Sequence, residues 1–396
     1  MIYLGFLLHI YQPPEQYDFV LKQIVEECYR PLFDLILRKP KARFTVNINW
    51  SLTELLLNNG YADVVESIKK CLDAGKIEIT GTAAYHVILP LIPEDLRRRQ
   101  IRINYENNKK IFGKNYTREG FFPPEMAFGH EIVSDIKVAG YKWTITEDIP
   151  FGCIHQEAPY NYIPSVDDLA VFLRSNHWSN SISFDKDAQG HHFRGDVVLG
   201  RMLRELGGWF KTQNGYMVLA MDGETFGHHV KGYIENFLEP FLDALERMED
   251  KIELVKITDL MEKFPKLEKS VPPGSWSTTS EDFWRGDFYP LWKSHYNKCH
   301  HILWELTDIA INSVRRLLED FDKSLNSCTY WWCPPSPDSS ESMPKMTKKG
   351  IDMLLNIIKE TNSSDYKKAL QLKEEFEGYF EKESKKEKEK VIKEGP

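Results

Sequence analysis

The stretch GYMVLAMDGETFGHH, residues 215–229, begins as a run of apolar residues and ends in a group of polar ones. Residues 216–221 have the length and composition of a buried β-strand. Asp222 ends this run, Glu224 follows it, and two glycines allow tight turns and the close approach of a ligand. An Asp-Gly pair also forms simple turns. Two acids and two imidazoles in eight residues favour a functional loop at the end of a strand.

The same alternation of short apolar runs and helical patterns extends from the first residue to about residue 265. Because parallel neighbours need a long crossover, strands that alternate with helices predict a parallel sheet covered by helices. At this chain length we expect a closed or nearly closed α/β barrel. The predicted strands are 2–9, 43–50, 76–81, 142–147, 169–174 and 216–221, and the predicted helices include 19–38, 63–74, 94–111 and 233–248.

The texture of the sequence changes after residue 264, where prolines and a Ser/Thr-rich stretch form a linker. Residues 295–319 and 342–360 have helical periodicity without strand signals, which predicts a small helical bundle. Lys and Glu dominate the last residues, as in a solvated helical tail. We therefore expect three parts: a barrel at 1–265, a helical domain at 266–365 and a charged tail at 366–396.

The bulk composition limits the partners and the compartment. The net charge is −8 with both signs mixed along the chain, so no sustained basic surface is expected for nucleic acid. The apolar N-terminal stretch lacks the basic leader and the length of an export or membrane segment, and we read it as a buried strand. Six cysteines without a CxxC pair favour free thiols. We expect a cytoplasmic protein without a membrane segment, which can form a homo-oligomer.

Functional groups of a parallel barrel collect at the C-terminal ends of its strands, so polar residues that end apolar runs are the candidates. The first strand ends in His9, followed by Tyr11. The loop GTAAYHVILP carries His86, which could equally be a buried structural imidazole. In GFFPPEMAF, Glu125 lies in an apolar stretch where a buried carboxylate needs partners or a function, although Pro-Pro-Glu also suits an exposed turn.

Two carboxyl groups about 5 Å apart can hydrolyse a glycosidic bond with retention of configuration, one as nucleophile and the other as general acid and base. Glu125 and Asp222 could form such a pair. The sequence has no HExxH, paired CxxC or EF-hand signature, so neither a metal nor another cofactor is expected. The high aromatic content suits sugar stacking as well as a large core.

Five segments together resemble glycoside hydrolase family 57, whose members act mainly on α-glucans and in some cases on α-galactosides. The segments are HIYQPP at 9–14, GTAAYHVILP at 81–90, FFPPEMAF at 121–128, MDGETFGHH at 221–229 and, more loosely, GSWSTTSEDFW at 274–284. The resemblance covers about the first 290 residues. It implies an incomplete (β/α)7 barrel followed by a small helical domain that helps to complete the active site.

The resemblance also implies roles for single residues. Glu125 would be the nucleophile and Asp222 the acid/base. The residues expected to bind the sugar are His9, Tyr11, His86, Glu224, Trp276 and Trp284. The family often has a second His where this chain has Tyr11, so its substrate can differ.

The expected function is that of a retaining glycoside hydrolase or transglycosylase acting on α-linked glucans or oligosaccharides by double displacement. Three alternatives stay open: an α-galactosidase of the same family, a non-catalytic carbohydrate-binding relative and a metal-dependent polysaccharide deacetylase. The deacetylase would require an Asp-Asp pair at the end of the first strand, where this chain has His9.

Overall fold

The structure, a computed structural model, describes residues 1–210, 213–313, 319–331, 333, 342–361 and 363–394. Its chain divides into two compact units. The first unit comprises Met1–Gln12, Gln16–Ala84 and Leu89–Trp276. The second comprises Pro13–Glu15, Tyr85–Ile88 and Ser277–Pro396.

Among the described residues, the first unit carries one sheet of ten strands. They are β1 (Ile2–Ile10), β2 (Phe44–Ile48), β3 (Ile77–Ile79), β4 (Gly120–Phe121), β5 (Trp143–Glu147), β6 (Ile163–Val166), β7 (Leu169–Arg174), β8 (Gly215–Asp222), β9 (Ile252–Val255) and β10 (Lys266–Glu268).

Seven of the strands seen in the described residues form a ring of parallel neighbours in the order β1, β2, β3, β4, β5, β7, β8 and back to β1. An isolated parallel bridge between Gly81 and Phe121 joins β3 to β4. The contact between β7 and β8 is narrow, with Arg174 and Val218 as its paired residues. The ring is therefore a (β/α)7 barrel that is nearly open on one side.

The side chains of each barrel strand alternate between two apolar clusters, as the period of two requires. On β1, Phe6 and Leu8 join the cluster that packs against the helices, whereas Leu7 joins the cluster inside the barrel. On β8, Leu219 belongs to the outer cluster and Ala220 to the inner one. Both faces of the strands are thus buried, which explains their continuous apolar sequences.

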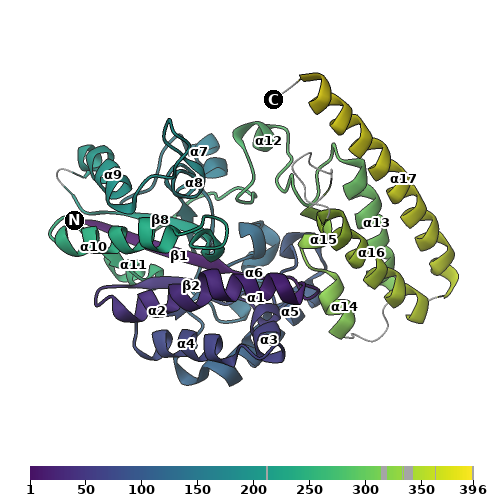
Figure 1. The fold of residues 1–396 in the computed structure, drawn as a ribbon, viewed down its shortest axis with the longest axis horizontal. Helices are drawn as coiled ribbons and strands as arrows, with labels where there is room; N and C mark the ends of the chain where they lie inside the picture. The colour runs from purple at the N-terminus through teal and green to yellow at the C-terminus, as the bar shows by residue number, and fades with distance from the viewer. Residues whose placement is uncertain (211–212, 314–318, 332, 334–341, 362, 395–396) are drawn as a thin grey trace. The chain divides into compact units, whose positions relative to one another are not determined.

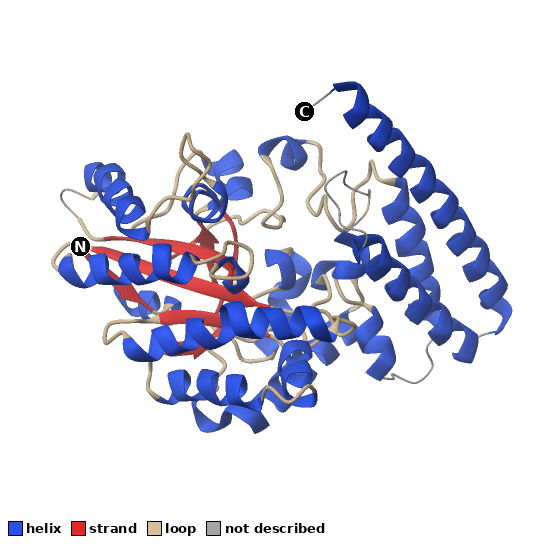
Figure 2. Cartoon of the chain, in the orientation of Figure 1, coloured by secondary structure: helices blue, strands red, loops and turns tan. Residues whose placement is uncertain are grey.

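Helices enclose the strands of this unit, as Figure 2 shows. They are α1 (Asp18–Ile24), α2 (Arg30–Arg38), α3 (Trp50–Asn58), α4 (Ala62–Asp73), α5 (Glu94–Phe112), α6 (His130–Val138), α7 (Asp148–His155), α8 (Asn176–Phe184), α9 (Gly195–Trp209), α10 (Glu239–Arg247) and α11 (Ile257–Lys263) (Figure 1).

Several helices begin directly after a strand because the intervening residue caps them. The side chain of Asn49 follows β2 and accepts a hydrogen bond from the N–H of Leu52 at 3.3 Å, which starts α3. This cap ends the strand at Ile48, two residues before the end of the predicted strand 43–50. Ser175 caps α8 in the same way directly after β7.

The second unit is helical and contains no strand in its described residues. Its helices are α12 (Ser280–Trp284), α13 (Lys298–Ser313), α14 (Glu319–Ser324), α15 (Cys328–Trp331), α16 (Ser342–Thr361) and α17 (Ser363–Glu394). Residues 314–318 of the predicted helix 295–319 lie outside the described residues.

The predicted fold class, an incomplete (β/α)7 barrel followed by a helical region, is confirmed. Two details of the fold were not predicted. The helix predicted at 19–38 contains a π-helical turn, Val25–Tyr29, between α1 and α2. The short strands β4, β6, β9 and β10 were not predicted. The predicted limits of the three parts stay a prediction.

Candidate active site

The C-terminal ends of five barrel strands carry polar residues that share one face. Residues two apart on a strand share a face. His9 lies two residues after Leu7 and Asp222 two after Ala220, so both side chains point toward the barrel interior. By the same alternation, Asn47 near the end of β2 and Glu147 and Arg174 at the ends of β5 and β7 lie on the inner face. The apolar interior of the barrel therefore ends in a polar layer at the C-terminal edge, where parallel barrels place their sites.

His9 is held from several sides at this edge. Its Nδ1 lies 2.7 Å from Oδ1 of Asn47, whose amide donates to Oγ1 of Thr80 at 2.9 Å. Its ring stacks on Phe122 with centroids 4.8 Å apart and an interplanar angle of 13°. Burial lowers the pKa of His9, against the opposing effects of Asp222 and Asn47. The imidazole is therefore neutral and fixed in orientation at neutral pH.

Asp222 is the register partner of His9 across β1 and β8. The residue keeps partial exposure, so a ligand can reach it. Desolvation of the carboxyl group raises the pKa of Asp222, while the charges of His9 and Arg174 lower it. A carboxylic acid with a raised pKa is suited to donate a proton near neutral pH.

Glu224 lies one turn further along the same loop and is buried. Its Oε1 accepts hydrogen bonds from the hydroxyl of Tyr29, from Nε2 of Gln12 at 3.1 Å and from the N–H of Tyr11 at 3.3 Å. Burial, with the nearby charge of Asp222, raises the pKa of Glu224 to about 8. Glu224 thus ties the loop after β8 to the loop after β1.

Glu125 lies in the loop after β4 with a left-handed backbone at φ 58°, and Met126 follows at φ 51°. Such values are uncommon outside glycine, so the surroundings must hold the loop in place. Met126 is fully buried in the inner cluster, and its carbonyl accepts from Oγ1 of Thr146 at 3.2 Å. The Glu125 residue is itself 5% exposed.

Trp276 connects Glu125 to the histidine. The N–H of Trp276 donates to the carbonyl of Glu125 at 3.2 Å. Its ring lies edge-on to His9, with centroids 5.7 Å apart. The ring of Tyr11 lies near the same imidazole, nearly parallel to it at 6.1 Å. The structure thus links Glu125, Trp276, His9 and Tyr11 to the edge that carries Asp222.

The two remaining candidates belong to the second unit. His86 has a φ of 58°, and its Nδ1 lies 2.9 Å from Oγ of Ser327. Trp284 ends α12 with 70% of its surface exposed and an edge-on contact to Phe283. His86 is therefore an anchored residue of that unit, whereas Trp284 presents its ring to solvent.

Sequence reasoning missed several members of the polar layer. Glu147 and Arg174 form a buried ion pair at 2.7 Å, and each is the last residue of a predicted strand. The strand-end criterion that selected Asp222 also selects these two. Asn47 fell inside a predicted strand, and Tyr29 lies on a helical segment without any local signal.

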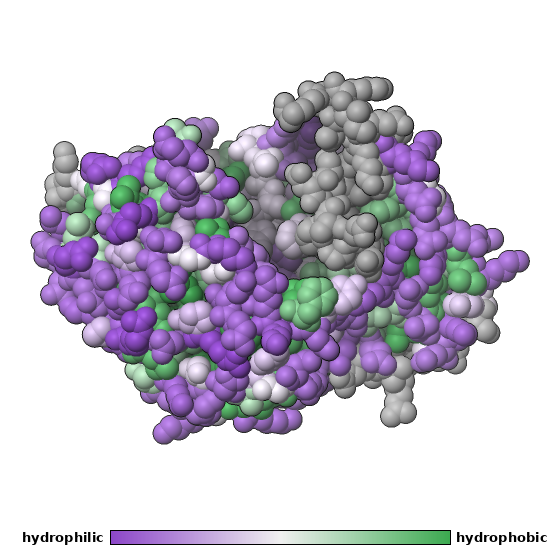
Figure 3. Space-filling view, viewed as in Figure 1, coloured by the Kyte–Doolittle hydropathy of each residue, from purple (hydrophilic) through white to green (hydrophobic). Residues whose placement is uncertain are grey.

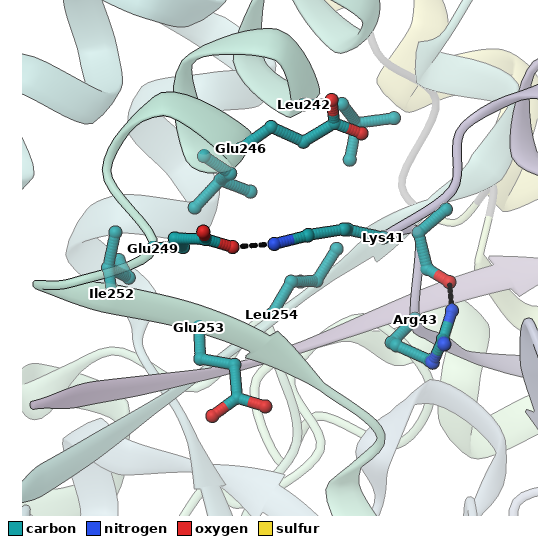
Figure 4. Close-up of a pocket in the computed structure, with 10 residues that line it drawn as sticks. Lys41, Arg43, Leu242, Glu246, Glu249, Ile252, Glu253 and Leu254 are labelled. Atoms are coloured by element: carbon teal, nitrogen blue, oxygen red, sulfur yellow. Dashed lines mark hydrogen bonds and ion pairs between the residues drawn. The ribbon is translucent and has the colours of Figure 1, made fainter.

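A cavity of about 330 Å³ lies elsewhere in the same unit (Figure 4). It is lined by the chain before β2, including Lys41 and Arg43, by α10 and by the start of β9. Lys41 pairs there with Glu249. Because this cavity lies at the N-terminal edge of the strands, it is separate from the polar layer that contains Asp222.

The described residues lack two kinds of feature. They contain no group of three or more His, Cys, Asp or Glu side chains arranged to hold a metal ion. No helix among them combines the length and apolar character needed to cross a bilayer. On the face of the barrel unit seen in Figure 3, hydrophilic residues predominate and apolar ones are scattered.

Known proteins share this sequence and architecture. A family model described as glycosyl hydrolase family 57 matches residues 8–271. An alpha-amylase from Pyrococcus horikoshii is 25% identical over 289 residues, which cover 70% of this chain and 43% of the relative. The chain thus spans less than half of that relative's length.

Solved structures agree on the fold. A 4-alpha-glucanotransferase from Thermococcus litoralis superimposes with a TM-score of 0.71 at 18% identity, over 90% of this chain and 59% of its own. A GH57-type branching enzyme from Pyrococcus horikoshii gives 0.66 at 15% identity, over 97% and 94%. Since the family model covers more than half of the sequence, the chain belongs to glycosyl hydrolase family 57.

Proposed function

We propose that this protein is a retaining glycoside hydrolase or transglycosylase that acts on α-linked glucans or oligosaccharides. Glu125 is the nucleophile and Asp222 the general acid/base. The observation that carries the proposal is the linkage of both acidic residues to His9. Asp222 is the register partner of His9, and the carbonyl of Glu125 accepts a hydrogen bond from Trp276, whose ring contacts that of His9. Relatives named alpha-amylase and 4-alpha-glucanotransferase support this substrate class.

The reaction has two steps. In the first, the Glu125 carboxylate attacks the anomeric carbon, the glycosidic C–O bond breaks, and Asp222 donates its proton to the departing oxygen. A glycosyl ester on Glu125 results. In the second, the Asp222 carboxylate removes a proton from water or from a sugar hydroxyl, whose oxygen attacks the anomeric carbon and releases Glu125.

The other residues of the layer suit sugar binding. The neutral His9 imidazole can exchange hydrogen bonds with hydroxyl groups, and the half-buried Trp276 offers an apolar ring for a pyranose face. Glu224, with its pKa raised to about 8, is protonated at neutral pH and adds a hydroxyl donor. We propose that His86 and Trp284 bring further sugar contacts from the helical part, and that this part helps to complete the site.

The choice of acceptor and sugar defines the experiment. Purified protein is incubated with soluble starch, maltooligosaccharides and α-galactosides, and the products are separated by size and linkage. Shorter glucans indicate hydrolysis, a ladder of longer ones indicates transfer, and free galactose supports the α-galactosidase alternative. Binding without any product in wild-type protein would favour the non-catalytic alternative and contradict the proposal.

Retention has its own test. Azide can take the place of the missing acid/base carboxylate. Under double displacement, Glu125 in Asp222→Ala attacks an activated α-glycoside from one face of the anomeric carbon, azide then attacks from the opposite face and releases Glu125, and the product is the α-glycosyl azide. A glycosyl azide with the same anomeric configuration as the substrate therefore supports retention. A product of opposite configuration contradicts double displacement.

The location and assembly of the protein stay predictions. All six cysteines are free thiols, and five of them are buried, which suits a reducing compartment such as the cytoplasm. The predicted capacity to form a homo-oligomer is tested by light scattering of the purified protein.

A further inference from the structure

The barrel is joined by a narrow contact beside the strand that carries Asp222. In the described residues, β8 pairs with β1 along its whole length, from Gly215 to Asp222. Its contact with β7 consists of the pair Arg174 and Val218, supported by the N–H of Ser175 donating to the Val218 carbonyl at 2.8 Å. The exposed edge of β8 therefore needs other hydrogen-bond partners beyond this point.

Side chains supply those partners at Ala220, two residues before Asp222. The N–H of Ala220 donates to Oγ of Ser179 on α8 at 3.2 Å. Its carbonyl accepts from Nε of Arg174 at 2.7 Å. Two side chains thus replace the missing strand neighbour where β8 enters the polar layer.

Arg174 is itself fixed from three sides. Besides Ala220, its Nη1 donates to Oε2 of Glu147 and its Nη2 to Oδ1 of Asn180, both at 2.7 Å. The Arg174 side chain is 5% exposed. A planar guanidinium with donors in a rigid fork can meet β5, α8 and β8 at once, whereas a lysine ammonium lacks this geometry.

The guanidinium of Arg174 faces a buried carboxylate. Glu147 is fully buried against it, and burial together with the charge of Glu147 raises the pKa of the neighbouring Asp148. Arg174 pairs with Glu147 at 2.7 Å. The positive charge of Arg174 lowers the pKa of Asp222, against the effect of burial, and His9 acts in the same direction when it is protonated.

We propose that Arg174 is a positioning residue for Asp222, which closes the gap between β7 and β8 and holds a positive charge beside the acid/base. The proposal rests on the proposed function of Asp222. The Arg174 guanidinium would therefore affect both the position of the Asp222 side chain and its ionisation. Substitutions of Arg174 can separate these two effects.

The test compares the pH dependence of kcat/KM for Arg174→Gln and Arg174→Lys with that of the wild type. The high-pH limb of this profile reports the loss of the proton from the general acid, Asp222. Loss of the charge in Arg174→Gln should move this upper limb to higher pH by about one unit, since a nearby cation stabilises the carboxylate. Arg174→Lys keeps the charge, so its limb should stay within about 0.3 units. Both variants should lose about 10-fold or more in kcat, because the fork to Ala220 and Asn180 is gone.

His9 and Glu224, the other titratable groups that act on Asp222 or are acted on by it, are unchanged in all these variants. Arg97→Gln is the matched control. Arg97 also binds a buried carboxylate, Asp135, but Arg98 binds that group too and neither arginine contacts the polar layer. The upper limb and the kcat of Arg97→Gln should equal those of the wild type.

A second pair of variants covers the case in which Arg174→Gln does not fold. Asn180→Asp places a carboxylate against Nη2 of Arg174 and should also move the limb upward, whereas Asn180→Ala should not. An unchanged upper limb in every folded variant that alters this charge would overturn the proposal.

Asp222→Asn is assayed in parallel to separate the two proposals. If it keeps full turnover, the proposed function of Asp222 has failed. If Asp222→Asn is inactive but the upper limb of Arg174→Gln has not moved, only the role of Arg174 is refuted.

Discussion

His9 and Asp222 lie opposite each other in the register of β1 and β8, so each titrates in the field of the other. Burial moves the pKa of His9 down and that of Asp222 up, toward the neutral form of both groups. At both groups, burial thus disfavours the charged form before substrate binds. A neutral pair is easier to bury beneath a sugar than an ionised one.

The acidic pair is tested by Glu125→Gln and Asp222→Asn. Each change should lower kcat by about 10²–10⁴-fold, because a positioned acid, base or nucleophile contributes on this scale. Steady-state rates and circular dichroism are measured together. Glu131→Gln, an exposed acid on α6, should leave both unchanged. Full turnover in Glu125→Gln would rule out its role as nucleophile.

The carboxyl group of Glu224 makes stability depend on pH. Its pKa is about 8 in the folded protein and near 4.5 in an unfolded chain, so between these values the folded state holds one more proton. The contribution of this group to the free energy of unfolding is fully present below about pH 4.5 and is lost as the pH rises through about 8. The loss is on the order of several kcal/mol. Denaturant unfolding at pH 5, 6.5 and 8 should show a flatter dependence in Glu224→Gln, and parallel curves would contradict the assignment.

The two tryptophans predicted to bind sugar differ in their surroundings. Trp276→Ala removes a half-buried ring that contacts His9 and Phe122, and KM should rise about 3–10-fold through lost stacking. Trp284→Ala removes an exposed ring, so the melting temperature should not change. KM for short and long maltooligosaccharides is the readout. A KM in Trp276→Ala equal to that of wild type would remove Trp276 from the sugar site.

Asn47→Asp exchanges the amide partner of His9 for a carboxylate. The negative charge should raise the pKa of the imidazole, against the lowering that burial causes. NMR titration of the His9 ring measures the shift directly. Turnover near pH 6 should fall, because a larger share of the rings is then charged. An unchanged titration would show that the Asn47 contact does not control the protonation of His9.

Gly227 is restricted by its backbone and by its neighbours. Its φ is +113°, and a Cβ there would lie 2.0 Å from the carbonyl oxygen of Glu27. Gly227→Ala should therefore destabilise the protein by about 2 kcal/mol or more. Gly152→Ala, on α7 with open space around the added methyl, should stabilise by about 0.5–1 kcal/mol. Thermal unfolding of both variants checks the contrast, and equal effects would contradict it.

The part of the site that follows strand ends was predictable, because an apolar run marks where a strand stops. This rule found His9 and Asp222, and it applies equally to Glu147 and Arg174, which end predicted strands but were not singled out. The fold followed from the same runs. The strand β4 did not, since a two-residue strand has no period to detect.

Contacts between distant segments left no signal in the sequence. Tyr29 donates to Glu224 from a π-helical turn 195 residues away, and nothing in its neighbourhood distinguishes it from a core tyrosine. The backbone of Glu125 was equally hidden, because its left-handed φ depends on packing around the loop and the residue is not a glycine.

The loop of Glu125 has a consequence for protein engineering. Its two left-handed residues are held by the burial of Met126 among Phe122, Ile145 and their neighbours inside the barrel. Grafting FFPPEMAF onto another scaffold would transfer the carboxylate without the packing that aims it. A functional graft has to carry the matching cavity for the methionine as well as the motif.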